Sequence, residues 1–439
     1  MFLTANRKQY LAVALAALAA ASMWFYVKLI LIPYQVQDAA QVGRPRGNLS
    51  DLYPRWLGAR ELLLHHRDPY SPEVTRDIQR GVYGRALDPS RTNDPKDEQA
   101  FTYPVYVAFL LAPTLGIAFQ MLRPIFSAML VVLVILVILL WNFVLGTKLS
   151  RAGILVAVLL ALGSFPIVQG IRLQQLTIVV AALLASSFLA RRMGSLLLSG
   201  FLMALATIKP QIALLPVLAM ILWAISDWAT RKRWLGGFFA TMGILLAASE
   251  YTLPGWIPKF VRGLHDYQRY TGGRSLLEAF LSPGVGTVLG YLLLVYAVWM
   301  SWRARNSAPD SVEGRHLVCL LLTAMVCAMP NATYNQIFLL PALLVFSQQN
   351  VFKSNRMLVR SFAWLTAVLL VWPWLVCIPL MATSSFFTTG GYARVWQVPL
   401  YGTLQLPLAI LALLLVLRKE AGVGGRSLAS VPRGVSCSL

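Results

Sequence analysis

Charge is scarce in this chain of 439 residues: 13% of them are charged and 58% are hydrophobic. Soluble globular domains carry about 25% charged residues, so the composition excludes a soluble fold. Acidic residues are the rarer charges, with 17 against 38 lysines and arginines, and the net charge is +21. A charge of this size is typical of nucleic-acid binding. Here, however, the basic residues stand in small groups between apolar runs, which is the positive-inside pattern of membrane proteins. We expect membrane lipids as partners and no nucleic acid.

Sequence patterns for metals and nucleotides are also absent. The chain has four cysteines without metal-ligand spacing, and three of them lie in or beside apolar runs, as buried thiols do. It contains no GxxxxGK[ST] phosphate loop, no GxGxxG motif after a strand and no HExxH zinc motif. We therefore expect no cofactor and no metal, and nucleotide-dependent chemistry on a soluble domain is disfavoured.

Apolar runs that can cross a bilayer, which takes about 20 residues, recur along the whole chain. The first run extends from Tyr10 to Pro33 and follows two basic residues. It ends in aromatic residues and a lysine instead of a cleavage site, so we interpret it as a retained helix with a cytoplasmic N-terminus. A polar stretch at residues 34–100 follows, and then an apolar segment from Phe101 to Phe119 that prolines interrupt.

The segment from Phe101 to Phe119 decides the topology. If it crosses the membrane, the basic clusters do not fall consistently inside. If it is a kinked helix at the outer interface, as its prolines permit, every cluster is cytoplasmic. The clusters are Lys148/Arg151, Arg191/Arg192, Arg231/Lys232/Arg233, Arg303/Arg305, Lys353/Arg356/Arg360 and Arg418/Lys419. We adopt the second alternative because it places all of them on the cytoplasmic side.

The expected fold is therefore an all-α polytopic membrane protein with about twelve transmembrane helices and a large first extracytoplasmic loop containing interfacial helices. The helices are expected near residues 10–33, 125–146, 152–168, 176–190, 195–208, 212–226, 235–252, 276–301, 315–330, 334–348, 360–380 and 398–417. The regions are 1–33 (N-terminal segment and first helix), 34–124 (outer loop with juxtamembrane helices), 125–417 (helices 2–12) and 418–439 (cytoplasmic tail).

Asp51 stands at the start of a helix predicted in the outer loop, just above the membrane surface. Ser50 or Asp51 can cap this helix, and Pro54 is tolerated in its first turn. Asp51 could also form an ion pair with Arg55, four residues on. A third interpretation is a functional acid, and the residues alone leave these alternatives open.

Lys209 ends an apolar helix and precedes Pro210. A lysine at such a place can simply extend toward the interface. In the predicted topology it lies on the outer side, where a lipid phosphate is its natural partner. Other polar residues fall on the same side: Arg172, Gln175, Gln211, Arg262, His265, Asp266, Tyr267, Arg269, Arg274 and Asn335. The segment at residues 251–274 suits a phosphate and a sugar, and it equally suits an interfacial loop with aromatic residues.

Several short motifs occur in an order that resembles glycosyltransferase family 87. They are Asp51-Leu-Tyr-Pro-Arg-Trp-Leu-Gly-Ala-Arg, Arg67-Asp-Pro-Tyr, Phe101-Thr-Tyr-Pro, Leu111-Ala-Pro, Phe165-Pro, Leu173-Gln-Gln-Leu, Ala206-Thr-Ile-Lys-Pro-Gln and Tyr334-Asn-Gln. The resemblance spans most of the chain and implies an integral-membrane glycosyltransferase of the GT-C fold. It also implies a polyprenyl-phosphate sugar donor and an acidic base in the first outer loop, where Asp51 is the matching acid.

On this resemblance we expect an inverting transfer of a hexose such as mannose to an extracytoplasmic lipid or glycan, at the outer side of a bacterial inner membrane. Asp51 would take the acceptor proton, and Lys209 with Arg262 or Arg269 would bind the donor phosphate. Substrate-binding candidates are Gln175, Gln211, His265, Asp266, Tyr267 and Asn335, and alternative bases are Glu61, His265 and Asp266.

The rival interpretation is a transporter or flippase of lipid-linked saccharides, which explains many helices and outward cations. A transporter usually places its polar groups near the midplane of two related halves. The sequence shows no internal repeat, and this rival leaves the loop carboxylate unexplained.

Overall fold

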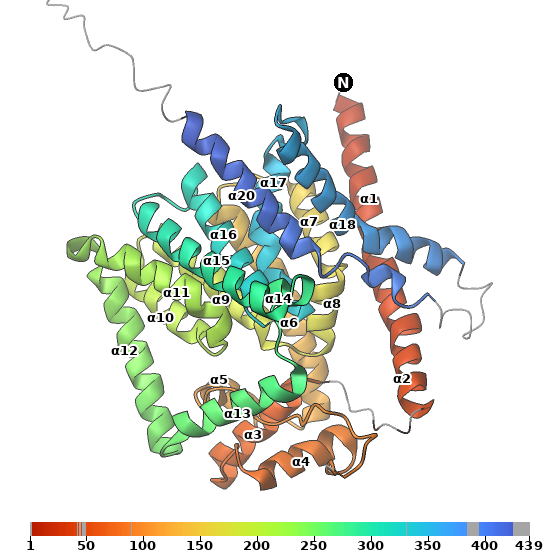
Figure 1. The fold of residues 1–439 in the computed structure, drawn as a ribbon, viewed down its shortest axis with the longest axis vertical. Coiled ribbons are helices and arrows are strands. Elements are labelled where there is room, and N and C mark those ends of the chain that lie inside the picture. Colours follow the sequence, from red (N-terminus) through yellow and green to blue (C-terminus); the bar gives the residue numbers. More distant parts are fainter. Residues whose placement is uncertain are drawn as a thin grey trace, which may run out of the picture.

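The structure, a computed structural model, describes residues 2–41, 43, 45, 50–88, 90–330, 332–383 and 395–424. Throughout these ranges the secondary structure is helical, without strands. Figure 1 shows a bundle of helices with a smaller group of helices at one end. Cys437 and the tail from residue 425, which the sequence analysis placed in the cytoplasm, lie outside the described ranges.

The first helix is longer than expected. α1 (Phe2–Tyr26) continues through a π-helical turn, η1 (Val27–Leu31), into α2 (Ile32–Gln41). The stretch Arg7–Gln41 forms one candidate membrane span of 35 residues. Its α1 part packs against α7 (Arg151–Leu162) and α18 (Met357–Ala382).

Four helices from two distant parts of the chain gather at one end of the molecule (Figure 1), which we call the loop end. They are α3 (Leu52–His65), α4 (Pro72–Tyr83), α5 (Val107–Leu111) and α13 (Trp256–Thr271). A Cβ atom at Gly58 of α3 would lie 2.3 Å from Cδ2 of the Phe101 ring. Only glycine at this position allows the segment before α5 to pack so closely on α3. α13 joins the group through an ion pair of 2.8 Å between Lys259 Nζ and Asp68 Oδ2.

The segment from Phe101 to Phe119 contains no helix of spanning length. It forms α5, which has five residues, and the three-residue 3-10 helix η2 (Ala112–Thr114). Crossing a bilayer takes about 20 helical residues. The expected kinked helix is thus replaced by short pieces, whose buried side chains pack against α3. Their position at a membrane interface stays a prediction.

The remaining chain forms the helix bundle, and each of the expected helical stretches contains helix. Its elements are α6 (Phe119–Val144), α7, α8 (Phe165–Arg172), α9 (Leu176–Arg192), α10 (Leu196–Ala206), α11 (Pro210–Ile225), α12 (Trp228–Thr252), α14 (Leu276–Phe280), α15 (Pro283–Arg303), α16 (Val312–Ala328), η3 (Thr333–Leu339), α17 (Leu340–Gln348), η4 (Val351–Lys353), α18, η5 (Val398–Leu400) and α20 (Leu406–Gly424).

Four of the expected helices are broken, and the last of them, 398–417, is divided into η5 and α20. The stretch 152–168 is divided into α7 and α8, which are bent by 63°. The break falls at Gly163 and Ser164, just before Pro166. The stretch 276–301 is divided before Pro283, and the stretch 334–348 begins as the 3-10 helix η3. A proline lacks the backbone donor that would continue a preceding helix, which accounts for the first two breaks.

Among the described residues, four helices are long and apolar enough to cross a membrane, or five if the bent pair of α7 and α8 forms one span. Three shorter apolar helices are Leu196–Ala206, Pro210–Ile225 and Leu406–Arg418. The protein is therefore an all-helical chain with several membrane-capable helices. Twelve spans stay a prediction.

The basic clusters meet at the end of the bundle opposite the loop end, which we call the basic end (Figure 1). Arg192 at the end of α9 pairs with Asp310 in the α15–α16 loop, with 2.8 Å between Nη2 and Oδ2. Arg231 at the start of α12 donates to the main-chain oxygen of Arg305, at 3.5 Å. The ends of α15 and α20 line one cavity together with η4. Segments that the sequence analysis placed on one side of the membrane thus lie side by side.

Candidate active site

The turn between α8 and α9 holds the start of α3 in place. The Asp51 amide donates to the main-chain oxygen of Leu173 at 2.9 Å, and Ser50 Oγ donates to Gln174 Oε1 at 2.7 Å. The Gln175 amide nitrogen donates to Asp51 Oδ2. Consecutive residues of one turn therefore bind two consecutive residues of the loop, across a separation of 124 positions.

Gln174 has the left-handed backbone conformation, with φ at 50°. This conformation is uncommon for a residue with a side chain and persists only where surrounding contacts impose it. The Gln174 amide nitrogen donates to Ser127 Oγ at 3.0 Å and to the Arg172 oxygen at 2.7 Å. These bonds keep the turn in the shape that presents Gln175 to Asp51.

Among the described residues, the Asp51 carboxylate serves neither as a helix cap nor as an ion-pair partner. Asp51 occupies the N-cap position of α3, but its side chain makes no capping hydrogen bond. Arg55 Nη1 donates to the main-chain oxygen of Asp51, at 2.6 Å, and not to the carboxylate. The two structural alternatives considered for Asp51 are therefore wrong in this structure.

The surroundings of Asp51 favour its neutral form. Burial raises the pKa of the Asp51 carboxyl, while the nearby cations Arg55 and Lys209 and the hydrogen bond from Gln175 oppose this shift. A carboxylate with a raised pKa is a stronger base than an ordinary aspartate, and perturbed pKa values of this kind cluster at functional sites.

Lys209 points into the protein. It is only 5% exposed, and its Nζ donates to Thr177 Oγ1. Thr177 Oγ1 in turn donates to Asn335 Oδ1 at 2.8 Å. Nζ also lies 5.0 Å from the centroid of the Tyr334 ring, a cation–π distance. The alternative in which this lysine extends toward the lipid interface is wrong.

Burial lowers the pKa of Lys209 to about 7, an effect that the neighbouring Arg55 reinforces and Asp51 opposes. Lys209 stands in the turn between α10 and α11, at the same end of the bundle as Asp51. Thr177, which accepts its hydrogen bond, comes from the first turn of α9, and Tyr334, whose ring it faces, comes from η3. Three distant segments therefore converge on one ammonium group.

Arg55 is a second, half-buried cation of the site, which the sequence indicated only as a possible ion-pair partner of Asp51. Its guanidinium lies 4.8 Å from the centroid of the Tyr103 ring. Within the described chain its Nε is buried and has no hydrogen-bond partner. Tyr267 of α13 is half-buried, and burial raises its pKa while Arg55 opposes the shift. Arg55 and Tyr267 are therefore electrostatic neighbours.

The structure brings together some of the predicted residues and separates others. Asp51, Gln175, Lys209, Asn335 and Tyr267 belong to this set, which we call the Asp51–Lys209 site. The other predicted residues lie elsewhere. Gln211 is half-buried in the first turn of α11 and forms no side-chain hydrogen bond with the described residues; His265 is exposed on α13.

Arg262 and Asp266 line a different hollow, of about 900 Å³, between α13 and the loop at residues 68–101. Arg269 is exposed and lies 4.0 Å from Asp266. Glu61, the first alternative base, is buried and bound by Arg67 at 2.8 Å. The cation that accompanies Lys209 in the structure is therefore Arg55.

Four members of the site were missed as functional residues: Arg55, Tyr103, Thr177 and Tyr334. Arg55 had a signal, because a residue four positions after Asp51 lies on the same face of a helix. Thr177 lies two positions after the predicted Gln175, and Tyr334 lies directly before the predicted Asn335. Tyr103 had no signal beyond its place in a short motif.

An apolar cavity of about 380 Å³ lies between α7, α17 and α18 and reaches η3. Its walls are mostly leucine, valine and aromatic side chains, and η3 contributes Gln336 and Leu339 to them. Gln336 Nε2 donates to the Thr403 oxygen at 2.7 Å. Gln336 Oε1 and Thr403 Oγ1 are buried without partners in the part of the chain that the structure describes. Because Tyr334 is also in η3, the cavity and the Lys209 ammonium share one short element.

An all-helical bundle with several membrane-capable helices, and with a half-buried acid beside the buried Lys209 and the half-buried Arg55, defines a membrane protein with an ionisable internal site. The family model described as glycosyltransferase family 87 matches residues 101–330 of the 439, more than half of the chain, and the chain belongs to that family. It is therefore a glycosyltransferase, and the resemblance found in the sequence is confirmed. No curated protein matches the chain. The matched range includes Gln175, Thr177 and Lys209, whereas Asp51 precedes it.

Proposed function

We propose that the protein transfers a hexose, such as mannose, from a polyprenyl-phosphate donor to an extracytoplasmic lipid or glycan, with inversion at the anomeric carbon. The site would face the outer side of a bacterial inner membrane, and the chain would cross it twelve times in a GT-C arrangement. The observation that carries the proposal is the Asp51–Lys209 site, in which a carboxylate that accepts a hydrogen bond from Gln175 and caps no helix lies beside the buried Lys209 and the half-buried Arg55.

The reaction needs one base and one set of cations. Asp51 takes the proton of an acceptor hydroxyl as the hydroxyl oxygen forms a bond to the anomeric carbon. The bond from this carbon to the phosphate oxygen breaks, and polyprenyl phosphate leaves with the electron pair. Gln175 holds Oδ2 of Asp51, which leaves Oδ1 for the acceptor. A single displacement of this kind inverts the anomeric centre.

The leaving phosphate requires positive charge, which is most effective in a site shielded from water. Lys209 and Arg55 supply it: the first is held by a neutral hydroxyl, and the second has an unused buried N–H group. No carboxylate lies within ion-pair distance of either cation among the described residues, so both stay available to a ligand. Arg262 and Arg269 stay predicted contributors from α13.

The donor also carries a long apolar chain. The apolar cavity beside η3 suits an isoprenoid, because its walls are hydrocarbon and it adjoins the element that places Tyr334 against Lys209. A phosphate at Lys209 and a chain in this cavity would leave the sugar toward Asp51 and the loop end. Family membership favours this transferase over the transport alternative.

Transfer by the purified protein tests the proposal. The protein in lipid nanodiscs is incubated with radiolabelled polyprenyl-phosphate mannose and a lipid and glycan extract of a bacterial envelope. We expect label in the acceptor fraction, dependent on Asp51. Nucleotide-linked mannose in place of the lipid donor should give none. Movement of the donor across a vesicle membrane without transfer would contradict the proposal and support a flippase.

A further inference from the structure

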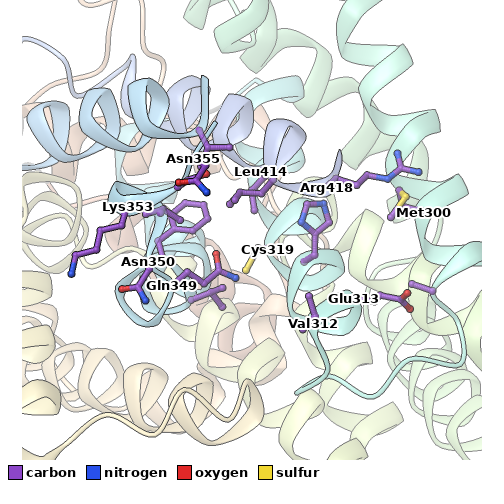
Figure 2. A pocket seen from close by; sticks show the side chains of 18 of the residues that line it. Met300, Val312, Glu313, Cys319, Gln349, Asn350, Lys353, Asn355, Leu414 and Arg418 are labelled. Carbon is purple, nitrogen blue, oxygen red and sulfur yellow. The ribbon is translucent and has the colours of Figure 1, made fainter. Parts of the chain in front are cut away.

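A second large cavity lies at the basic end of the molecule, opposite the Asp51–Lys209 site. Its volume is about 840 Å³, within the range of small-molecule sites. The far ends of α15, α17 and α20 line it together with the starts of α16 and α18. Figure 2 shows Arg418 and Met300 on one side of it and Asn350 and Lys353 on the other. None of the residues of the Asp51–Lys209 site lines it.

The rim of this cavity carries more positive than negative charge. Arg303, Lys353 and Arg418 contribute to it, and the acid among its lining residues is Glu313. Glu313 already accepts a hydrogen bond from Ser307 Oγ, at 2.7 Å. Neither arginine has a carboxylate within 4.0 Å among the described residues. The carboxylates of the described residues therefore leave this local positive charge unpaired.

Aromatic rings hold the two arginines in place. The Arg418 guanidinium lies 5.1 Å from the Tyr296 ring centroid and 4.9 Å from that of Trp299, and it donates to the Tyr296 hydroxyl. Arg303 lies 5.1 Å from the same tryptophan ring. A guanidinium that packs on a ring keeps its remaining N–H donors free, and its side chain loses less conformational entropy when it binds an anion.

A donor or acceptor without a partner also lines the cavity. His316 Nε2 is buried and makes no hydrogen bond to any described residue. A buried polar atom left unpaired destabilises a structure by about 1–3 kcal/mol, and such atoms are commonly satisfied by a ligand or an ordered water molecule. Its position on α16, one turn from Glu313, points to a polar ligand in the same cavity.

The floor of the cavity is apolar. It consists of buried side chains that include Cys319, Val345, Phe346, Val351 and Leu414. A small inorganic anion would leave this surface unused. A ligand with an anionic group at one end and hydrocarbon at the other would use both the rim and the floor.

We propose that this cavity binds an anionic phospholipid of the surrounding membrane, with its phosphate at Arg303 and Arg418 and the first carbons of its chains on the apolar floor. The basic end is where the predicted topology places the cytoplasmic leaflet, whose anionic lipids attract basic protein segments. The lipid is neither donor nor acceptor of the transfer reaction, and its site is separate from the one that carries the reaction.

The test measures binding of soluble short-chain lipids to the full-length protein in nanodiscs made of phosphatidylcholine. Dihexanoyl phosphatidylglycerol, dihexanoyl phosphatidylcholine and inorganic phosphate are titrated separately, and complexes are counted by native mass spectrometry. The variants are Arg418→Ala, Arg418→Lys and Arg303→Ala. The matched control is Arg360→Ala, which removes an exposed cation of the same end that does not line the cavity.

We expect saturable binding of phosphatidylglycerol and a rise of about tenfold or more in its Kd for Arg418→Ala, because a charged hydrogen bond contributes about 1.5–3 kcal/mol. Arg418→Lys should recover part of the affinity, and Arg360→Ala should bind like the parent. If Arg418→Ala does not fold, Arg303→Ala gives the same test, because Arg303 is exposed and forms no hydrogen bond or ion pair with the described residues. Equal loss in Arg360→Ala, equal binding of phosphatidylcholine, or equal binding of inorganic phosphate would overturn the proposal.

Discussion

Replacing Asp51 with asparagine removes a proton acceptor and preserves most of what the structure builds around it. The new asparagine side chain keeps an oxygen that can accept the hydrogen bond from Gln175. The main-chain oxygen that binds Arg55 and the amide that binds Leu173 are unchanged. The carboxylate makes no capping bond, so the start of α3 loses nothing.

The expected effects on folding and on catalysis therefore differ in size. A hydrogen bond to a charged group contributes about twice as much as a neutral one, so the substitution should lower the free energy of unfolding by about 1 kcal/mol at most. Removing a buried charge opposes even that loss. General-base catalysis contributes about 10²–10⁴ in rate, which corresponds to about 2.7–5.5 kcal/mol of activation free energy.

Single-turnover transfer from radiolabelled polyprenyl-phosphate mannose measures the catalytic effect. A donor-binding titration measures donor affinity, and thermal unfolding measures stability. We expect Asp51→Asn to lose at least a hundredfold in rate, within that 10²–10⁴ range, with donor affinity and melting temperature near those of the parent. The matched control is Asp38→Asn, which changes an exposed carboxylate of α2. A rate within a few-fold of the parent would refute the role of Asp51 as the base.

Further predictions concern the cations, the pH dependence and the topology. Lys209→Met should raise the donor KM by about tenfold or more, since it removes a charged hydrogen bond to phosphate. Arg262 lies in a separate hollow, so Arg262→Ala should have a clearly smaller effect on KM in the same kinetic assay. A larger effect of Arg262→Ala would indicate that the phosphate binds at α13. The profile of kcat/KM against pH should be bell-shaped: activity should fall below the raised pKa of Asp51, which must be ionised, and above about pH 7, where Lys209 loses its proton. In Lys209→Arg the fall in activity on the alkaline side should disappear, because arginine stays protonated. If the fall persists at the same pH, a group other than Lys209 causes it. A reporter fused after Lys148 should read cytoplasmic, because the segment 101–119 is too short in helix to cross; an external reading would overturn the twelve-helix topology.

The helices were largely predictable because apolar runs and basic clusters are local signals. Breaks within the helices were less predictable from the sequence. The bend between α7 and α8 comes from Gly163, Ser164 and Pro166 acting together, and the apolar run passes through all of them without interruption. α13 differs from the predicted interfacial loop. Trp256, Phe260, Leu264 and Tyr267 repeat with helical spacing, but the many charges between them obscure that pattern in the sequence.

The site was predictable where an ionisable residue stood out against its surroundings. Asp51 and Lys209 are unusual in their local sequence, and each could be singled out alone. Their association depends on the α8–α9 turn, whose left-handed Gln174 carries no local signal. Thr177 looks like an ordinary polar residue of an apolar helix until the fold places its hydroxyl against the lysine. Such pairings depend on tertiary contacts, which single-sequence patterns do not encode.

The excess of positive charge in the Asp51–Lys209 site makes the stability of the whole protein depend on whether an anionic ligand is bound there. Two cations, the buried Lys209 and the half-buried Arg55, lie near one carboxylate, and burial disfavours the charged form of both Lys209 and Asp51. An anionic ligand supplies the missing negative charge, so the folded state gains free energy as the site fills. With free ligand at 100 times its Kd the gain is about 2.7 kcal/mol. The enzyme emptied of lipid should therefore be its most fragile form, and detergent extraction that strips the donor would make it easier to unfold.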